Sequence, residues 1–200
     1  TLLQRNIASR LDAQGRPIPL IAETGGMNAM IVDSSALTEQ VVIDVLASAF
    51  DSAGQRCSAL RVLCLQDEIA DHTLKMLRGA MAECRMGNPG RLTTDIGPVI
   101  DSEAKANIER HIQTMRSKRR QVFQAVRENS EDAREWQSGT FVAPTLIELD
   151  DFAELQKEVF GPVLHVVRYN RNQLPELIEQ INASGYGLTL GVHTRIDETI

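Results

Sequence analysis

Segments with the apolar pattern of strands alternate with segments of helical spacing along the whole chain. This alternation is typical of an α/β fold with a mainly parallel sheet flanked by helices, and that is the fold class we expect. Helices are predicted over residues 1–13, 37–52, 68–86, 103–118 and 174–183. Strands are predicted over residues 18–22, 29–32, 60–65, 121–126, 141–149, 163–169 and 188–193. Asp33, Ser34 and Ser35 are the expected N-caps of the second helix, and the polar stretch 128–138 is expected to be a surface loop.

The composition argues against several classes of function. Of the 200 residues, 42% are hydrophobic and 24% are charged, which is enough for a sizeable globular core. The net charge of −6 disfavours nucleic acid and anionic membranes as partners. No apolar run approaches the ~20 residues of a membrane span, and the basic stretch at residues 116–120 is interpreted as a solvated helix end. We therefore expect no nucleic-acid contact and no membrane span.

Three cysteines, Cys57, Cys64 and Cys84, occur without C-x-x-C spacing. This argues against a metal site or a disulfide framework and for a reducing compartment. Cys64 falls inside a strand pattern and Cys84 falls on the apolar stripe of a helix, so both are expected to be structural. Cys57 instead lies in a glycine-containing turn beside Arg56, which is an unusual place for a buried structural thiol.

Cys57 and Glu23 are the candidate catalytic pair. Glu23 is followed by Gly25 and Gly26, and a thiol with a distant carboxylate base is what covalent catalysis at a carbonyl requires. From the residues alone, both have simpler interpretations. A cysteine without a partner is more often a small buried hydrophobe, and a glutamate at the end of a strand is more often solvated. His111, by the same reasoning, is more simply a core histidine than a ligand.

Five short motifs resemble, in this order, those of the NAD(P)-dependent aldehyde dehydrogenase superfamily. They are Glu23-Thr24-Gly25-Gly26, Gly54-Gln55-Arg56-Cys57, Gly87-Asn88-Pro89, Glu158-Val159-Phe160-Gly161-Pro162 and Tyr186-Gly187-Leu188. The resemblance runs from residue 1 to residue 200. The chain departs from the family at Met27, where lysine is common. The resemblance implies that the chain is a fragment of a larger enzyme with the catalytic fold of this family.

The resemblance also implies a nucleophile and a base. Cys57 would add to an aldehyde carbonyl to form a thiohemiacetal, which becomes a thioester once hydride has passed to NAD. The backbone N–H of Cys57 would be half of an oxyanion hole. Glu23 would activate the hydrolytic water. Because a fully solvated carboxylate is a poor base at neutral pH, we expect Glu23 to be partly buried.

Cofactor and substrate contacts follow from the same resemblance. Glu158 would accept hydrogen bonds from the nicotinamide ribose hydroxyls, and Phe160 would pack near the nicotinamide. The backbone of Thr24 and Gly25 would approach the nicotinamide amide. Ser58 would line the aldehyde pocket. The implied cofactor is NAD, and no metal is implied.

Residues 54–59, 139–146 and 185–194 look most like the pyrroline-5-carboxylate dehydrogenase branch, and within it the bacterial bifunctional enzymes of proline utilization. This resemblance implies NAD-dependent oxidation of L-glutamate-γ-semialdehyde to glutamate, with FAD only in a separate proline dehydrogenase domain. Residues 1–25 would end the dinucleotide-binding domain and residues 26–200 would form the truncated catalytic domain. The parent would be cytoplasmic and homo-oligomeric, and we expect the fragment alone to be inactive.

Other interpretations stay open. An aldehyde dehydrogenase for another class of substrate would use the same residues. An acyl-phosphate reductase of related fold also forms a cysteine thioester, with less need for a hydrolytic glutamate. A non-catalytic interaction module is the third alternative. Binding of NAD and titration of the thiols would separate these.

Overall fold

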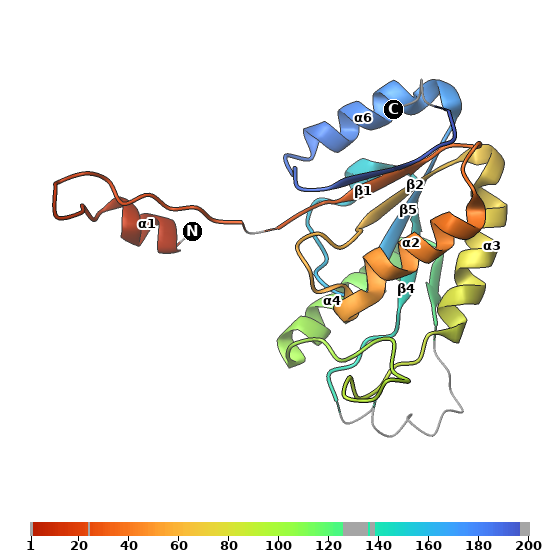
Figure 1. Ribbon diagram of the computed structural model, residues 1–200, viewed down its shortest axis with the longest axis horizontal. Helices are drawn as coiled ribbons and strands as arrows, with labels where there is room; N and C mark the ends of the chain where they lie inside the picture. The colour runs from red at the N-terminus through yellow and green to blue at the C-terminus, as the bar shows by residue number, and fades with distance from the viewer. Residues whose placement is uncertain (1, 24, 126–135, 137–138, 197–200) are drawn as a thin grey trace.

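One six-stranded sheet runs through the computed structural model, which describes residues 2–23, 25–125, 136 and 139–196 (Figure 1). The strands are β1 (Ala29–Val32), β2 (Val62–Gln66), β3 (Val122–Gln124), β4 (Thr145–Leu149), β5 (Val163–Tyr169) and β6 (Leu190–His193). Their spatial order is β3-β4-β5-β2-β1-β6. Every neighbouring pair is parallel except β3–β4, which is antiparallel. The predicted mainly parallel α/β fold is therefore confirmed.

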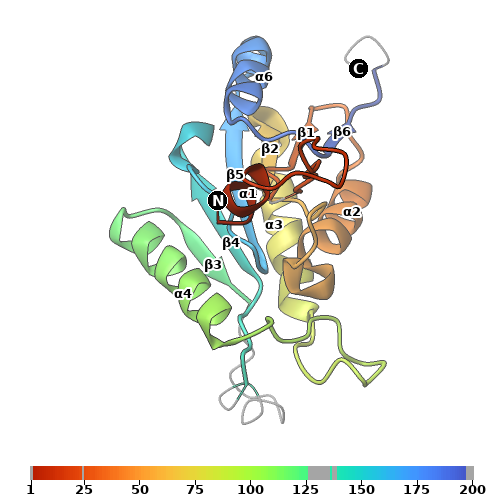
Figure 2. The same cartoon turned by 90° about the vertical axis from the view of Figure 1, so that its left-hand side faces the viewer.

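Helices pack on both faces of this sheet. They are α2 (Thr38–Phe50), α3 (Asp67–Glu83), α4 (Ser102–Ser117) and α6 (Leu174–Ala183), whereas α1 (Leu2–Ala8) lies away from the sheet and has no buried residue. Figure 2 shows α2 and α3 on one side of the sheet and α4 on the other. On β5, His165 contacts His111 of α4, whereas Arg168 binds Asp71 of α3. Residues three apart in a strand face opposite sides, so the two contacts place the two helix layers on opposite faces.

The central strands form the core. Every residue of β1 and β2 is buried, and in β5 only Arg168 is exposed. These strands are rich in Val, Leu and Ile, as expected of parallel strands that are covered on both faces. Their burial fixes the positions of the turns that lead into them.

Local sequence sets the starts of several helices. The Asp101 side chain accepts a hydrogen bond from the Ala104 N–H at 2.8 Å and so caps α4. Asn170 and Gln173 form a capping box in the short 3-10 turn before α6. The helical segments that follow begin within one residue of the predicted positions.

The predicted helix over residues 1–13 is shorter than expected, since α1 ends at Ala8. Leu3 and Leu11, which belong to the apolar stripe that motivated the prediction, are 70% and 62% exposed. Because most of a helix's stability in a protein comes from packing of its apolar face, the stripe by itself does not extend the helix.

The predicted strand over residues 18–22 is wrong. Residues 9–23 lie apart from the sheet, on the left of Figure 1, and lead toward β1. Pro17 and Pro19 lack the backbone N–H that a strand ladder needs, and the side chains between them and Glu23 are exposed. The apolar pattern was therefore not sufficient evidence for a strand.

Two other boundaries differ from the predictions. None of the predicted N-caps, Asp33, Ser34 and Ser35, caps α2, because the helix begins at Thr38 and Leu37 occupies its N-cap position. The Asp33 carboxylate instead accepts hydrogen bonds from the backbone N–H and the hydroxyl of Ser35, at 2.7 and 2.6 Å. Helix α3 ends at Glu83, three residues before the predicted end, because residue 86 forms a β-bridge with residue 96. The predicted loop at 128–138 lies almost entirely outside the described residues.

Within the part of the chain that the structure describes, no helix is both long enough and apolar enough to cross a membrane. The basic stretch at residues 116–120 ends α4 and is paired within the protein. Arg116 donates to Gln124, and Arg120 binds the carboxylates of Asp150 and Glu154. This agrees with its interpretation as a helix end.

Candidate active site

Three of the predicted motifs meet at one edge of the sheet. The chain enters β1 from residues 25–28, β2 from residues 54–61 and β5 from residues 158–162. Because these three strands are parallel neighbours, their amino ends lie side by side. The sheet topology therefore brings together three features. They are the glycine turn (Gly25 and Gly26), the predicted nucleophile Cys57 and the predicted cofactor carboxylate Glu158.

A tight reversal after α2 exposes Cys57. Ser52, Ala53 and Gly54 have φ angles of 55°, 54° and 65°, all in the left-handed region. A Cβ on Gly54 would lie 2.2 Å from the carbonyl oxygen of Gly161, so only glycine fits there. Cys57 is exposed at the end of this reversal, where a substrate could reach its thiol.

Arg56 and Gln55 fasten the turn to its surroundings. The Arg56 guanidinium donates to the carbonyl of Ala47 at 2.7 Å, near the end of α2, where the helix dipole favours a cation. Gln55 accepts from the Ile100 N–H at 2.8 Å and donates to the carbonyl of Pro98 at 3.3 Å. Arg56 is thus engaged at a helix end.

Arg61 lies beneath the thiol turn, the segment of residues 54–59 that carries Cys57, and is fully buried. Its Nη1 donates to the carbonyl of Gly54 at 2.7 Å, and its Nη2 donates to the carbonyl of Arg56 at 3.1 Å. Burial lowers the pKa of Arg61, and the neighbouring Glu158 carboxylate opposes that shift. The side chain binds both ends of the reversal that presents Cys57.

Glu158 joins the thiol turn to the glycine turn. Its Oε1 accepts from Arg61 Nε at 3.0 Å and lies 2.9 Å from Arg61 Nη2. Its Oε2 accepts from the Gly26 backbone N–H at 3.1 Å. The Phe160 ring, 46% exposed, lies beside this pair with its centroid 5.1 Å from the Arg61 guanidinium carbon. The two predicted cofactor contacts therefore lie at the amino edge, close to the thiol turn.

Asn28 holds the thiol turn from the other side. Its buried amide nitrogen donates to the carbonyls of Cys57 and Ala59, at 2.7 and 2.8 Å. Its amide oxygen accepts from the Thr189 N–H at 3.1 Å. A Cβ on Gly26 would lie 2.9 Å from the Cys57 carbonyl oxygen, so the two turns are in backbone contact.

The other two thiols are placed differently from Cys57. Cys64 is buried in β2, and burial raises its pKa to about 12. Cys84 is half-buried at the end of α3, packs against the core, and donates to the carbonyl of Ala80. Both positions agree with the predicted structural roles.

Glu23 is exposed, so the expected partial burial is not found. Glu23 ends the extended segment that leads toward β1, and no strand of the sheet lies beside this segment. Thr24 lies outside the described residues. Gly25 is described, and a Cβ on it would lie 2.8 Å from Glu158 Oε2. Gly25, whose backbone is predicted to approach the nicotinamide amide, therefore lies next to Glu158, the predicted cofactor carboxylate.

Ser58 is exposed and lines a cavity of about 210 Å³ between the thiol turn and β6. Asn28, Thr189 and Gly191 also line this cavity. The cavity lies directly beside the predicted nucleophile. The role of Ser58 in an aldehyde pocket stays a prediction.

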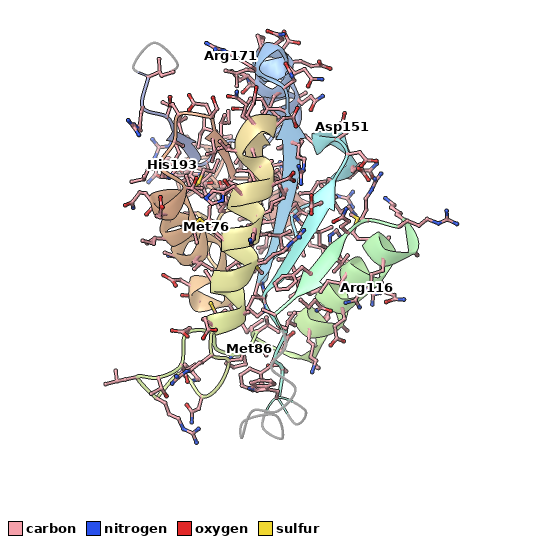
Figure 3. The ribbon with its side chains drawn as sticks, turned by 90° about the vertical axis from the view of Figure 1, so that its right-hand side faces the viewer. Met76, Met86, Arg116, Asp151, Arg171 and His193 are labelled. Atoms are coloured by element: carbon pink, nitrogen blue, oxygen red, sulfur yellow. The ribbon has the colours of Figure 1, made fainter. Side chains whose placement is uncertain are left out.

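A groove of about 570 Å³ runs between α4 and residues 154–160, and Glu158, Phe160 and His111 line it. His111 is half-buried and its Nε2 lies 2.9 Å from Nε2 of His165. Burial lowers the pKa of His111, and it lowers the pKa of His165 to about 3. Both rings are neutral near pH 7, which supports the interpretation of His111 as a packed histidine. Figure 3 shows the other side of the molecule, with Met76 on α3 and Met86 just past the end of that helix.

The residues at this edge suit a nicotinamide ribose. The Glu158 carboxylate offers acceptors for ribose hydroxyls, the half-exposed Phe160 ring offers a flat apolar surface, and both line a groove. Among the residues that the structure describes, no group of three or more His, Cys, Asp or Glu side chains could hold a metal ion.

Sequence reasoning missed Arg61 and Asn28. One signal was available for Arg61, because it is the only charged residue in the apolar run from residue 59 to residue 65. A charge at such a place must be paired, since an isolated buried charge is costly. Asn28 carried no comparable signal, because asparagine is common in turns.

Comparison with known proteins identifies relatives along the whole chain. The model of the aldehyde dehydrogenase family matches residues 3–200. The chain is 98% identical to the bifunctional protein PutA of Escherichia coli (strain K12) over 200 residues, which are 100% of this chain and 15% of that protein. It is 58% identical to the bifunctional protein PutA of Rhizobium meliloti, again over the whole chain and 16% of the relative. The chain thus spans about a sixth of the length of these relatives.

Solved structures of aldehyde dehydrogenases also match the fold of this chain. A crystal structure of a bifunctional proline utilization A (PutA) protein matches with a TM-score of 0.88 and 46% identity, over 99% of this chain and 19% of that one. A betaine aldehyde dehydrogenase from Staphylococcus aureus, solved in complex with NAD+, matches with a TM-score of 0.78 and 30% identity, over 88% of this chain and 35% of that one.

Proposed function

Because the chain belongs to the aldehyde dehydrogenase family, we propose that it is the thiol-bearing part of a larger enzyme that oxidises L-glutamate-γ-semialdehyde to glutamate with NAD. Residues 26–200 belong to the catalytic domain, and residues 1–25 end the cofactor domain. The substrate is suggested by the printed names of the relatives, which are bifunctional proteins of proline utilization. The parent is a cytoplasmic homo-oligomer, with FAD confined to a separate proline dehydrogenase domain.

The observation that carries the proposal is that the turn with the exposed thiol and the carboxylate of Glu158 are bound to the same buried arginine. Cys57 sits on a turn that is anchored through Arg61 to Glu158, and Glu158 also binds the glycine turn. Of the other two thiols, Cys64 is buried in β2, and Cys84 is half-buried against the core at the end of α3. Such an arrangement supports covalent chemistry at a carbonyl next to a bound ribose.

In the proposed reaction, the Cys57 thiol first loses its proton to water. The thiolate sulfur then forms a bond to the aldehyde carbon, and the carbonyl oxygen becomes the oxyanion of a thiohemiacetal. The backbone N–H of Cys57 donates to that oxygen. As the C=O bond re-forms, the carbon loses its hydrogen as hydride, and a thioester to Cys57 remains. A nicotinamide held by Glu158 and Phe160 would supply the hydride acceptor.

Glu23 is assigned the second half of the reaction. Its carboxylate takes a proton from a water molecule, whose oxygen attacks the thioester carbon. The C–S bond then breaks, the thiolate of Cys57 leaves, and the acid is released. Glu158 would hold the ribose and Phe160 would hold the nicotinamide. The nicotinamide ring would then keep a fixed position relative to the thiol turn.

The full-length parent enzyme tests this proposal. We expect kcat/KM for the semialdehyde to exceed that for an aliphatic aldehyde of similar length by at least about 100-fold, because a site that pairs both charged ends discriminates strongly. The Cys57→Ala variant should oxidise neither. A preference for the simple aldehyde would exclude the semialdehyde assignment, and formation of an acyl phosphate would favour the reductase alternative.

A further inference from the structure

Two backbone segments touch beneath the thiol turn. The Cβ that Gly54 lacks would lie 2.2 Å from the carbonyl oxygen of Gly161, and the one that Gly161 lacks would lie 2.3 Å from Ile108 Cδ1. The loop that carries the thiol and the loop that carries the cofactor carboxylate are therefore in direct contact. Any group that binds both loops will fix the distance between them.

Arg61 is such a group. It donates to Gly54 and Arg56 in the thiol loop, and to Gly161 at 3.4 Å in the carboxylate loop. It also forms the ion pair with Glu158, whose side chain is only 11% exposed. All three guanidinium nitrogens are used, and they serve both loops at once.

Only arginine suits this position. A guanidinium has five N–H donors in a rigid plane and can bind several acceptors in different directions, whereas a lysine ammonium is a point charge on a flexible stem. With lysine at position 61 the charge would stay, but one nitrogen could not reach Gly54, Arg56 and Glu158 together.

The arginine also orients the carboxylate. Glu158 Oε1 is occupied by Arg61, and Oε2 is occupied by the Gly26 N–H. An ionised carboxylate has about four acceptor sites. Arg61 Nε and Nη2 both face Oε1, so Oε2 keeps capacity for a further donor while the plane of the group is fixed. A ribose would meet a carboxylate that is already in one orientation, which lowers the cost of ordering on binding.

We propose that Arg61 is a positioning residue that holds Glu158 at a fixed place relative to the Cys57 turn, so that cofactor affinity and the order of the thiol turn depend on one side chain. The part of this inference that concerns the cofactor rests on the proposed function. The part that concerns the thiol turn depends only on the contacts of Arg61.

The experiment uses Arg61→Lys, Glu158→Gln and the double variant in the full-length parent enzyme. Arg120→Lys is the control, because Arg120 also binds two carboxylates but lies between α4 and β3. Two quantities are measured for each variant. They are the Kd for NAD, and the hydrogen exchange of the peptide that covers residues 54–60 in the absence of NAD. Melting temperature shows which variants are folded.

We expect Arg61→Lys to raise the Kd for NAD by about tenfold and to speed exchange in the 54–60 peptide by at least about tenfold, since buried charge-assisted contacts are lost. Glu158→Gln should raise the Kd as well, and the double variant should be no worse than the more severe single one. If the two effects on the Kd multiply, or if Arg61→Lys behaves like Arg120→Lys, the inference is wrong.

Two further outcomes are distinguishable. A wild-type enzyme that fails to bind NAD would overturn the proposed function, while the exchange data would still decide whether Arg61 orders the thiol turn. If Arg61→Lys does not fold, the Glu158→Gln variant alone tests whether the thiol turn depends on the contact between Arg61 and Glu158. Faster exchange in the 54–60 peptide of that variant would support the coupling of the two loops, and unchanged exchange would contradict it.

Discussion

Replacing Asn28 by alanine should loosen the turn that presents Cys57 while leaving the fold intact. The Asn28 amide makes three hydrogen bonds, to the carbonyls of Cys57 and Ala59 and from the N–H of Thr189. A net contribution of about 1 kcal/mol for each bond gives a loss of about 3 kcal/mol. This corresponds to an increase of roughly 100-fold in the equilibrium constant for local opening.

Native-state hydrogen exchange in the full-length enzyme measures this opening directly. Two amides in the turn report on it, because the Ala59 N–H donates to the carbonyl of Arg56 and the Leu60 N–H donates to the carbonyl of Ser48. Their exchange should become roughly 100-fold faster in Asn28→Ala. Asn182→Ala, at an exposed asparagine in α6, is the matched control and should leave the turn unchanged.

The isosteric variant Asn28→Asp sharpens the test. A carboxylate has the same shape as the amide but cannot donate, so it would face the Cys57 and Ala59 carbonyls with an additional charge. We expect exchange at least as fast as in Asn28→Ala. Retention of wild-type protection in either variant would refute the reasoning that the amide donors hold the turn.

Three further predictions concern individual side chains. Cys57, the exposed thiol, should react with iodoacetamide faster than the other two cysteines in the native enzyme, and equal labelling of all three would contradict its assignment. Glu23→Gln should give a burst of NADH followed by slow turnover, because deacylation is slowed more than hydride transfer, and wild-type steady turnover would exclude Glu23 as the base. Burial lowers the pKa of His165 to about 3, so the unfolded chain gains a proton as the pH falls below about 6.5 while the folded chain does not. Stability should therefore fall between pH 6.5 and pH 3, and His165→Gln should reduce the drop in melting temperature between pH 7 and pH 5, whereas His72→Gln on the exposed face of α3 should not.

Much of the fold could be predicted because its core strands have simple patterns. Strands β1, β2 and β5 are short apolar runs preceded by turn residues, and their positions in the sequence were sufficient to place them within two residues. The site motifs directly precede these strands, so the sheet alone brings Cys57 and Glu158 to one edge. Spacing in the sequence could not show this, because 101 residues separate the two and the strand order is not the chain order.

The errors came from segments whose structure depends on a packing partner. The predicted helix over 1–13 and the predicted strand over 18–22 both carried apolar patterns, but their side chains are largely exposed. A pattern reports that a face could be buried, and only the tertiary structure determines whether a surface is there to cover it. Asp33 failed as a helix cap for a related reason, since its carboxylate was engaged by Ser35 in a local turn.

The two ends of the motif that runs from Glu23 to Gly26 have different surroundings. Gly26 must lack a side chain because the Cys57 carbonyl is so close, and its N–H is needed by Glu158. Both contacts are made inside this chain, so the positions of Cys57, the proposed nucleophile, and Glu158, the proposed cofactor carboxylate, are fixed by its own core. Glu23, three residues earlier, is exposed, and a solvated carboxylate is a weak base at neutral pH. Its proposed role therefore requires that another part of the parent protein cover it. It follows that the nucleophile can be ordered in this chain while deacylation depends on the rest of the enzyme, and for that reason we expect the isolated chain to show no turnover.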